Sequence, residues 1–303
     1  MDIQTELRKL KISVIIPVYN DRENLAICLD AIKRQTLPSK DFEVIVVNNG
    51  TAESLTQSEE WPSNVVLCHE PIPGSYAARN RGATAGRGEV LAFTDADCIP
   101  EPGWLQHALE CFSETGCDMI GGLIELFKKE QGSNLTYIYE KNHLFKQKAN
   151  VEQGVSVTAN FFIKRAAFEE TGGFNAEIKS MGDMEFTGRC TESGLKLVYS
   201  EMAKVRHPAR VSISDVLKRR RRIVCWKTIH GGLDGKGKRI RLLRLAIIRA
   251  LFDFRSFIRK KPKKGNVADT LRFQWMIAIV ATYEFYVRLK ISIGAMDPRD
   301  VRE

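Results

Sequence analysis

Short hydrophobic runs alternate with helix-periodic stretches over the first hundred residues. The predicted strands cover 11–20, 41–47, 65–67 and 90–93, and helices are predicted at 22–35 and from about Ser75 to Ala83. Short apolar runs closed by polar turn residues are typical of strands that are buried on both faces. Strand, helix and strand repeated in this way predict right-handed βαβ units around a parallel sheet.

The pattern continues less regularly to about residue 210. Helices are predicted at 103–115, 135–148, 165–171 and 182–193, and strands at 118–127, 155–163 and 195–200, after which the strand pattern stops. We therefore expect an α/β protein with a mostly parallel, doubly wound sheet in residues 1–210, followed by a helical C-terminal extension in residues 211–303.

The charge is distributed unevenly between these two parts. The net charge of the chain is +9. From residue 201 onward, 26 Lys and Arg stand against 9 Asp and Glu, a net charge of +17. Residues 1–200 contain 20 Lys and Arg and 28 Asp and Glu, a net charge of −8. Residues 218–222 read KRRRR. In 241–260, arginines at helical spacing fall within an arc of about 140° and apolar side chains lie opposite. The segment 218–260 thus predicts contact with an anionic membrane surface, although a helical cap or a subunit interface fits the same pattern.

Several classes of protein are disfavoured. The first residues lack the apolar core of a signal peptide, and no run of about 18 apolar residues occurs. Seven cysteines without Cys-x-x-Cys spacing suggest reduced thiols and no zinc site, so we expect a cytoplasmic protein, peripheral on the inner face of the membrane. A nucleic-acid partner is not expected, because only Trp226 lies close to the basic run for base stacking.

Two acidic side chains follow the predicted strand at 90–93. Asp95 and Asp97 flank a single residue, so their side chains point the same way in extended backbone. Ligands bind at the carboxyl edge of open α/β sheets, and paired carboxylates suit Mg²⁺ or Mn²⁺ with a substrate phosphate. A solvated turn with an Asx cap would give the same pattern.

Several stretches taken together resemble the family 2 glycosyltransferases, which have the GT-A nucleotide-diphospho-sugar transferase fold. They are SVIIPVYN at 13–20, VIVVNNGT at 44–51, PGSYAARNRG at 73–82, VLAFTDADCIPEPGW at 90–104, GGFN at 172–175, GDMEF at 182–186 and VRHP at 205–208. The resemblance covers residues 11–210. It implies an inverting glycosyltransferase that moves a sugar from a nucleotide-sugar, expected to be a UDP-sugar, to a hydroxyl of a glycan or lipid-linked acceptor, as in polysaccharide biosynthesis.

The resemblance also implies roles for the acidic residues. Asp95 and Asp97, the DxD motif, would hold Mn²⁺ or Mg²⁺ on the diphosphate, and His207 would be a further ligand. Asp183 would be the general base that takes the proton from the acceptor hydroxyl. The family motif usually has Glu before this Asp, whereas Gly182 stands here. Asp183 could instead simply favour the N-terminus of a helix.

Residues near the donor follow from the same resemblance. Pro17, Tyr19 and Asn20 would form a wall beside the base and ribose. Asn48 stands where the family commonly has an Asp that contacts the base. Asn can still hydrogen-bond a pyrimidine edge with different donor and acceptor roles, so uridine is an expectation from the resemblance.

The remaining motif residues carry weaker expectations. Arg79 and Asn80 match positions near the nucleotide and diphosphate, with a solvated helix face as the alternative. The resemblance also allows part of the basic run at 218–222 to reach the diphosphate. Glu185 could bind acceptor or support the base, or, like Asp183, simply favour the N-terminus of a helix. Trp104 would face the acceptor, or equally belong to the core.

The residues disfavour three rival functions. A nucleotidyltransferase needs a Gly-rich basic loop after the first strand, which PVYNDREN lacks, and a dehydrogenase needs Gly-x-Gly-x-x-Gly there. A catalytically silent nucleotide-binding relative is disfavoured because Asp95, Asp97, Asp183 and His207 are all present.

Overall fold

The computed structural model describes residues 10–50, 55, 61–230, 244 and 266–299. Two compact units are formed: the first contains the described residues up to 125 together with 145–178 and 182–207, and the second contains the remainder. The predicted boundary at 210 falls inside the second unit. Apart from Arg244, the predicted amphipathic helix at 241–260 lies outside the described residues.

One half of the eight-stranded sheet is parallel, as predicted. It comprises β1 (Ile12–Val18), β2 (Phe42–Asn48), β3 (Val65–His69) and β4 (Val90–Thr94) in the order β3-β2-β1-β4. These strands are mainly apolar because helices cover both faces, and every residue of β2 and β4 is buried. The carboxyl ends of β1, β2 and β4 consequently meet at one edge of the sheet.

The other half contains antiparallel pairs, so the sheet is mixed and the prediction of a mostly parallel sheet is wrong. The order continues from β4 through β7 (Asn160–Lys164), β6 (Met119–Phe127), β8 (Leu197–Pro208) and β5 (Ile99–Pro100). Antiparallel pairing joins β4 to β7, β6 to β7 and β5 to β8. A buried apolar run looks alike in either direction, because the path of the connecting chain decides the direction of a strand.

Two strands differ from their predicted lengths. β8 was predicted to end at residue 200 but continues to Pro208, and it pairs with the unpredicted two-residue β5. In this part of β8, Ala203 and Val205 are buried whereas Met202 is exposed, so the strand alternates and lacks a continuous apolar run. Residues 155–159, predicted as strand, precede β7.

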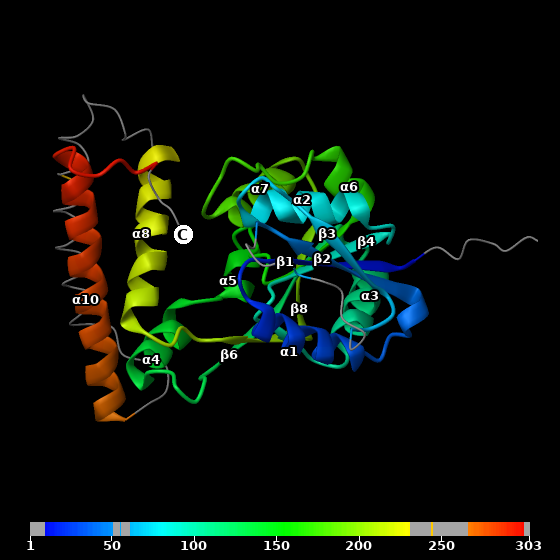
Figure 1. Ribbon diagram of the computed structural model, residues 1–303, viewed down its shortest axis with the longest axis horizontal. Coiled ribbons are helices and arrows are strands. Elements are labelled where there is room, and N and C mark those ends of the chain that lie inside the picture. Colours follow the sequence, from blue (N-terminus) through cyan, green and yellow to red (C-terminus); the bar gives the residue numbers. More distant parts are fainter. Residues whose placement is uncertain (1–9, 51–54, 56–60, 231–243, 245–265, 300–303) are drawn as a thin grey trace, which may run out of the picture. The chain divides into compact units, whose positions relative to one another are not determined.

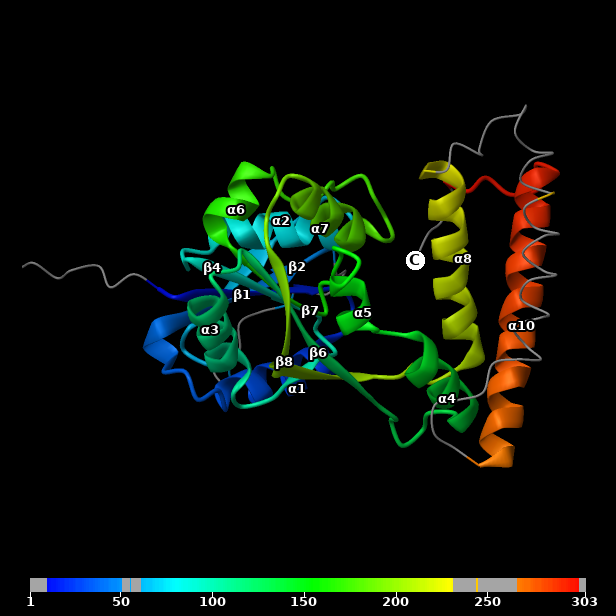
Figure 2. The ribbon, with the colours of Figure 1, turned by 180° about the vertical axis from the view of Figure 1, so that it is seen from behind.

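Helices cover both faces of the sheet in the first unit (Figures 1 and 2). On one face lie α1 (Arg22–Lys33) and α3 (Trp104–Thr115), and on the other lie α2 (Ser75–Ala85), α6 (Arg165–Glu170) and α7 (Gly182–Glu192). The second face is built on aromatic contacts among Phe93, Phe161, Phe168, Phe174 and Phe186. This packing anchors the start of α7 near the carboxyl edge.

The second unit is helical. It contains α4 (Asn134–His143), α8 (Ile213–His230) and α10 (Val267–Ser292), and α10 packs against both of the others. Its core includes Tyr139 from α4, Val216 from α8 and Met276 from α10. Among the described residues, no helix combines the length and the hydropathy needed to span a bilayer.

The helix predicted at 135–148 is two helices. α4 ends at His143 and the short α5 (Gln147–Val151) follows. Phe145 between them has φ of 45°, in the left-handed region that an α-helix does not contain. Phe145 belongs to the first unit, like His207, and the centroids of their rings lie 4.6 Å apart.

Candidate active site

The polar residues predicted to bind nucleotide gather at the carboxyl edge of the parallel strands. Tyr19 and Asn20 follow β1, Asn48 ends β2 and Asp95 follows β4. Asn20 turns the chain toward α1 with φ of 48°, a conformation that Asn tolerates better than most residues. The Tyr19 side chain is 54% exposed, so its ring is accessible for stacking.

Arg79 lies under this edge as a buried cation. Its side chain comes from α2, is 4% exposed, and its Nη2 donates to Asp95 Oδ1 at 2.5 Å. The guanidinium also lies 5.5 Å from the centre of the Tyr76 ring. Its Nε is buried and has no hydrogen-bond partner among the described residues, so one N–H donor is left for a ligand at the edge.

The side chains predicted to bind metal are brought together by the pairing of β5 with β8. One ligand atom each from Asp95, Asp97, Cys98 and His207 lies within 4.8 Å of the others. His207 Nε2 lies 3.5 Å from Asp97 Oδ1. Because Ile99 pairs with Arg206, the neighbouring His207 is aligned with the turn that carries the two aspartates.

The donor set fits a hard divalent cation better than a thiophilic one. Burial raises the pKa of the Cys98 thiol well above its ordinary value, and Asp97 and Asp95 raise it further. The protonated Sγ donates to the carbonyl of Ala159 at 3.6 Å, so it is not poised as a thiolate. Two carboxylates and one imidazole remain, which suit Mn²⁺ or Mg²⁺ with phosphate oxygens completing the shell.

Asp183 stands in the first turn of α7 near Arg79. Its Oδ1 accepts from the Tyr76 hydroxyl at 3.3 Å and from the backbone N–H of Met184 at 2.9 Å. Burial raises the pKa of Asp183, and the negative charge of Asp95 adds to this, while Arg79 opposes it. A carboxylate with a raised pKa is a stronger base than an exposed one.

Glu185 lies two residues further along the same helix. Its Oε1 pairs with Arg189 Nε at 3.1 Å, and Arg189 also donates to the carbonyls of Thr171 and Gly173. The other oxygen, Oε2, is buried and has no hydrogen-bond partner among the described residues. Through Arg189, Glu185 therefore helps to hold the loop that contains Thr171 and Gly173, and its Oε2 is left as a hydrogen-bond acceptor.

Two other predicted residues are engaged by the fold. Trp104 is completely buried, and its Nε1 donates to Asn160 Oδ1 at 2.8 Å, so it belongs to the core and does not face an acceptor. Asn80 donates to the carbonyl of Phe174 and accepts from its N–H, at 2.7 and 3.0 Å. Its contact with the diphosphate stays a prediction.

Sequence reasoning missed several residues that shape the edge. Tyr76, Asn49 and Phe145 touch Asp183, the loop before α2 and His207 respectively. Asn49 accepts from the N–H of Gly74 and donates to the carbonyls of Glu70 and Ile72. The position of Tyr76 inside the PGSYAARNRG motif was a usable signal, whereas the other two depend on long-range packing.

Comparison with known proteins finds similar sequences among glycosyltransferases. Residues 13–172 match the family model described as Glycosyl transferase family 2. The glycosyltransferase AglE of Haloferax volcanii is 34% identical over 218 residues, covering 70% of this chain and 71% of the relative. A pre-mycofactocin glycosyltransferase of Mycobacterium tuberculosis is 28% identical over 222 residues, covering 69% of this chain and 45% of the relative.

Two solved structures share the fold at low identity. A crystal structure of GalNAc-T7 with UDP, GalNAc and Mn²⁺ has a TM-score of 0.54 at 18% identity, covering 67% of this chain and 44% of that one. Staphylococcus aureus TarS has a TM-score of 0.51 at 15% identity, covering 94% and 55%. The chain thus spans about half the length of these two proteins, and the predicted GT-A fold is confirmed.

Proposed function

The chain belongs to glycosyltransferase family 2, and we propose that it is an inverting enzyme that transfers a sugar from a UDP-sugar to a hydroxyl of a glycan or lipid-linked acceptor. One observation carries the proposal. A cluster of candidate metal ligands and a buried carboxylate of raised pKa lie beside a single guanidinium, that of Arg79. The metal ligands suit a departing diphosphate, and the buried carboxylate of Asp183 suits an attacking hydroxyl.

Asp95, Asp97 and His207 would hold Mn²⁺ or Mg²⁺ against the diphosphate. When bound, the cation neutralises charge on the leaving nucleoside diphosphate. In the chain itself, the pair with Arg79 engages Asp95 Oδ1 and limits the freedom of that carboxylate. The unpartnered Arg79 Nε supplies a donor of the kind that a diphosphate oxygen accepts.

Nucleotide binding would use the same edge of the sheet. We propose that Pro17, Tyr19 and Asn20 lie beside the ribose and base, with the exposed Tyr19 ring available for stacking. Asn48, 7% exposed at the end of β2, offers both a donor and an acceptor to a pyrimidine edge.

The acceptor would bind beside the first turn of α7, which carries Asp183 and Glu185. The proton leaves the acceptor hydroxyl for Asp183 as the oxygen attacks the anomeric carbon, and the bond to the diphosphate breaks on the opposite face. Attack from the face opposite the leaving group inverts the configuration. The buried Glu185 Oε2 is suited to accept a hydrogen bond from a second acceptor hydroxyl.

Thermal unfolding in the presence of UDP tests the donor side directly. UDP with Mn²⁺ or Mg²⁺ is expected to raise the melting temperature, because a ligand that binds only the folded state stabilises it. The shift should depend on metal, and Asp97→Asn should abolish that dependence, whereas Asp118→Asn, away from the edge, should retain it. If no nucleoside diphosphate stabilises the protein with either metal, the proposed function is wrong.

We further propose that residues 1–210 carry the transfer reaction and that residues 211–303 bring the enzyme to an anionic membrane as a peripheral protein. The segment 218–260 was the predicted contact. In the described part of that segment, Arg220 is engaged internally, since its Nε donates to Glu284 Oε1 at 2.6 Å. Among the described residues of the second unit, most of the exposed large hydrophobic side chains lie instead on α10.

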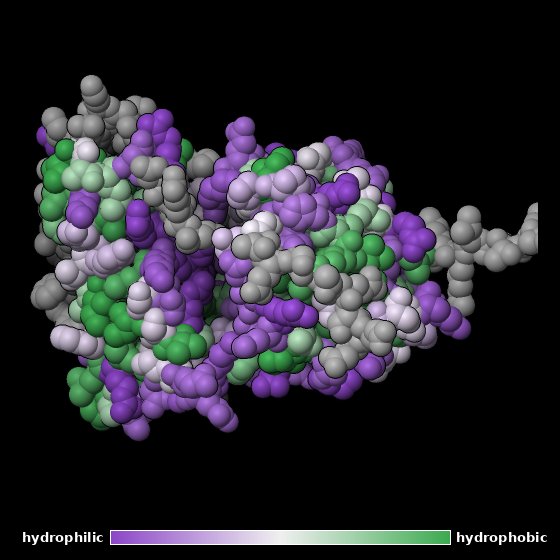
Figure 3. All heavy atoms as spheres, in the orientation of Figure 1, coloured by the Kyte–Doolittle hydropathy of each residue, from purple (hydrophilic) through white to green (hydrophobic). Residues whose placement is uncertain are grey.

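The outward face of α10 is mainly apolar and runs the length of the helix. Its most exposed hydrophobic side chains, with those of the residue that follows the helix, are Val267 (78%), Leu271 (61%), Trp275 (62%), Tyr286 (46%) and Ile293 (64%). At 100° per residue these positions fall within an arc of about 100° that contains no charged residue. Figure 3 shows hydrophobic spheres gathered where Figure 1 places α10.

Lipid suits this face better than a second copy of the chain. The described residues of the second unit contain 16 Lys and Arg against 6 Asp and Glu, a net charge of +10, which would repel an identical unit. Arg272 and Lys290 border the apolar arc, and Lys290 Nζ lies 4.7 Å from the centre of the Tyr286 ring. Bordering cations and interfacial aromatic rings are typical of surfaces that bind anionic lipid.

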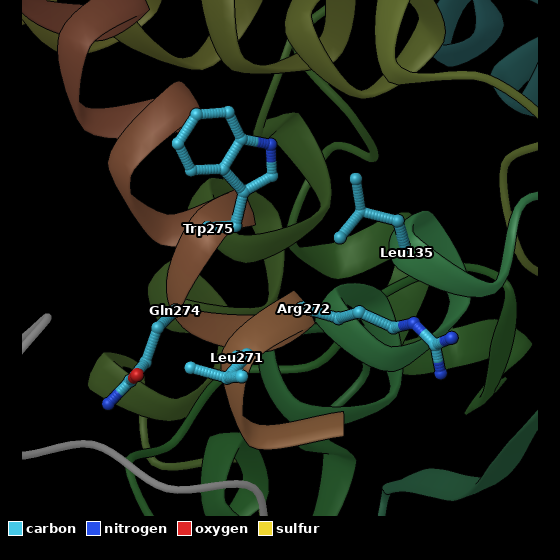
Figure 4. Close-up of a pocket in the computed structure, with 5 residues that line it drawn as sticks. All are labelled: Leu135, Leu271, Arg272, Gln274 and Trp275. Carbon is cyan, nitrogen blue, oxygen red and sulfur yellow. The ribbon is translucent and has the colours of Figure 1, made fainter. Parts of the chain in front are cut away.

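An open pocket on this face offers room for an acyl chain or for part of a lipid headgroup. It is lined by Leu135 from α4 and by Leu271, Arg272, Gln274 and Trp275 from α10. In Figure 4, Leu135 lies across the pocket from Trp275. The lining is mainly apolar with one cation, as an anionic lipid would require.

A further inference from the structure

The hydroxyl of Tyr76, from α2, reaches the candidate base, Asp183, at the start of α7. Tyr76 is the second residue of α2, is 6% exposed, and donates to Asp183 Oδ1 at 3.3 Å. The guanidinium of Arg79 lies over its ring, 5.5 Å from the ring centre, and the centre of the Phe174 ring lies 5.7 Å away. These two contacts and the burial of the side chain restrict the position of the hydroxyl.

The residue before the base makes room for this ring. A Cβ at Gly182 would lie 2.7 Å from Cε2 of Tyr76, 2.9 Å from Cδ2 and 3.0 Å from Cζ. Separations below 3.0 Å are essentially never tolerated, so a side chain at position 182 and the present place of the ring exclude each other. In this chain, a Glu at position 182 would require the Tyr76 ring to move.

From this mutual exclusion we infer that Tyr76 is a positioning residue for the general base, occupying the space of the missing side chain at position 182. The inference rests on the proposed role of Asp183. The phenol and the N–H of Met184 both engage Oδ1, which orients the carboxylate so that Oδ2 receives the proton of the acceptor hydroxyl. The acceptor oxygen gains the bond to the anomeric carbon as its O–H bond breaks.

The phenol is suited to act as a permanent donor. Burial raises the pKa of Tyr76, and the neighbouring charge of Asp183 raises it further, so the hydroxyl keeps its proton at any working pH. A hydrogen bond to the charged form favours ionisation of Asp183 and counteracts its burial. The other groups that act on this carboxylate are Arg79 from α2, Asp95 from the turn after β4, and the N–H of Thr158.

Titration of Asp183 itself is the decisive measurement. The full chain is labelled with ¹³C-aspartate, and the carboxyl signal of Asp183 is identified as the one that Asp183→Asn removes. Tyr76→Phe removes only the hydroxyl and is expected to raise the pKa of Asp183 by about 1–2 units, because a hydrogen bond to a charged group is lost. Tyr199→Phe, which removes a partly buried phenol elsewhere in the same unit, should leave this pKa unchanged.

A second variant tests the shared space. Gly182→Ala places a methyl group against the ring, so it should displace the hydroxyl and raise the pKa of Asp183 in the wild-type background. In the Tyr76→Phe background no hydroxyl is left to displace, and the same substitution should add no further shift. A merely structural role for Tyr76 would lower thermal stability without this coupling.

The outcomes separate this inference from the proposed function. An unchanged pKa in Tyr76→Phe, or an equal shift in Tyr199→Phe, overturns the positioning role while leaving Asp183 as the base. Retained sugar transfer by Asp183→Asn removes the base itself, and the positioning role with it.

Discussion

Asp183 has the surroundings that the proposed proton transfer requires. Burial raises its pKa above the ordinary value of 3.8, and hydrogen bonds from Tyr76 and Met184 fix one of its oxygens. The sequence motif identified the residue, but the partner that orients it comes from a helix more than 100 residues earlier. The motif that identifies Asp183 is thus local in the sequence, whereas the hydrogen bond from Tyr76 joins residues far apart in the chain.

Replacing this carboxylate should separate catalysis from binding. Asp183→Asn is expected to lower transfer by about 10²–10⁴-fold, because an amide does not accept the proton, while UDP still raises the melting temperature in the presence of metal. Steady-state kinetics and thermal unfolding measure the two effects. Glu192→Gln, an exposed change on the same helix, should alter neither. Loss of UDP binding in Asp183→Asn would contradict the assignment of Asp183 to the acceptor side.

At the scale of elements, the pairing of β5 with β8 completes the candidate metal site. β5 is two residues long, and without it His207 would have no fixed relation to Asp95 and Asp97. The strand was missed because two residues carry no periodicity, and the end of β8 was missed because its inward side chains alternate with exposed ones. Short edge pairings of this kind are decided by the rest of the sheet.

A buried ion-pair network joins α8 to α10 in the second unit. Glu284 is 3% exposed and accepts from Arg220 Nε at 2.6 Å and from Arg288 Nη2 at 2.8 Å. Burial raises its pKa, but the two guanidinium groups outweigh this and hold the pKa below the ordinary value of 4.5. Such a pair stabilises the fold at neutral pH and loses its contribution as pH falls through the lowered pKa.

Removing the charge of Glu284 should therefore destabilise the helical unit. Glu284→Gln is expected to cost about 3 kcal/mol at pH 7, because two partly buried guanidinium groups lose their counter-charge. Urea denaturation measures the change, which should shrink at pH 4. Asp30→Asn, which breaks the exposed pair with Arg34, should cost less than about 0.5 kcal/mol. Equal effects of the two variants would show that the network adds no stability.

At the scale of the whole molecule, charge and hydrophobic surface are concentrated in the C-terminal part. Residues from 201 onward carry a net charge of +17, and α10 exposes an uncharged apolar face. A helix that is apolar on both its inner and outer faces needs a partner on each. The core of the second unit covers the inner face, and the proposed membrane contact covers the outer one.

Vesicle binding by the full chain tests this contact. Sedimentation with phosphatidylcholine vesicles containing phosphatidylglycerol should carry the protein down at low salt, and less so at high salt. Trp275→Ser and Leu271→Ser should each weaken binding by about tenfold or more, since burying a large apolar side chain contributes about 1.5–3 kcal/mol. Ile27→Ser, which removes an exposed apolar side chain of similar size on α1, should not weaken vesicle binding.

Light scattering of the same variants tests whether a second copy of the chain, and not lipid, covers the outward face of α10. A wild-type dimer that Trp275→Ser converts to a monomer would identify a subunit interface in place of a membrane contact. Unaltered vesicle binding in both serine variants would place the lipid contact away from α10.

The sequence by itself determined the class of fold, the parallel strands and the candidate residues Asp95, Asp97, Asp183 and His207. These follow from short-range patterns, because buried strands, helix periods and motif spacing are written in neighbouring positions. Only the tertiary structure decided the direction of the later strands, the burial of Trp104, the internal pairing of Arg220 and the approach of Tyr76 to Asp183. Each of these depends on residues distant in the chain, whose contacts are set by the packing of the whole.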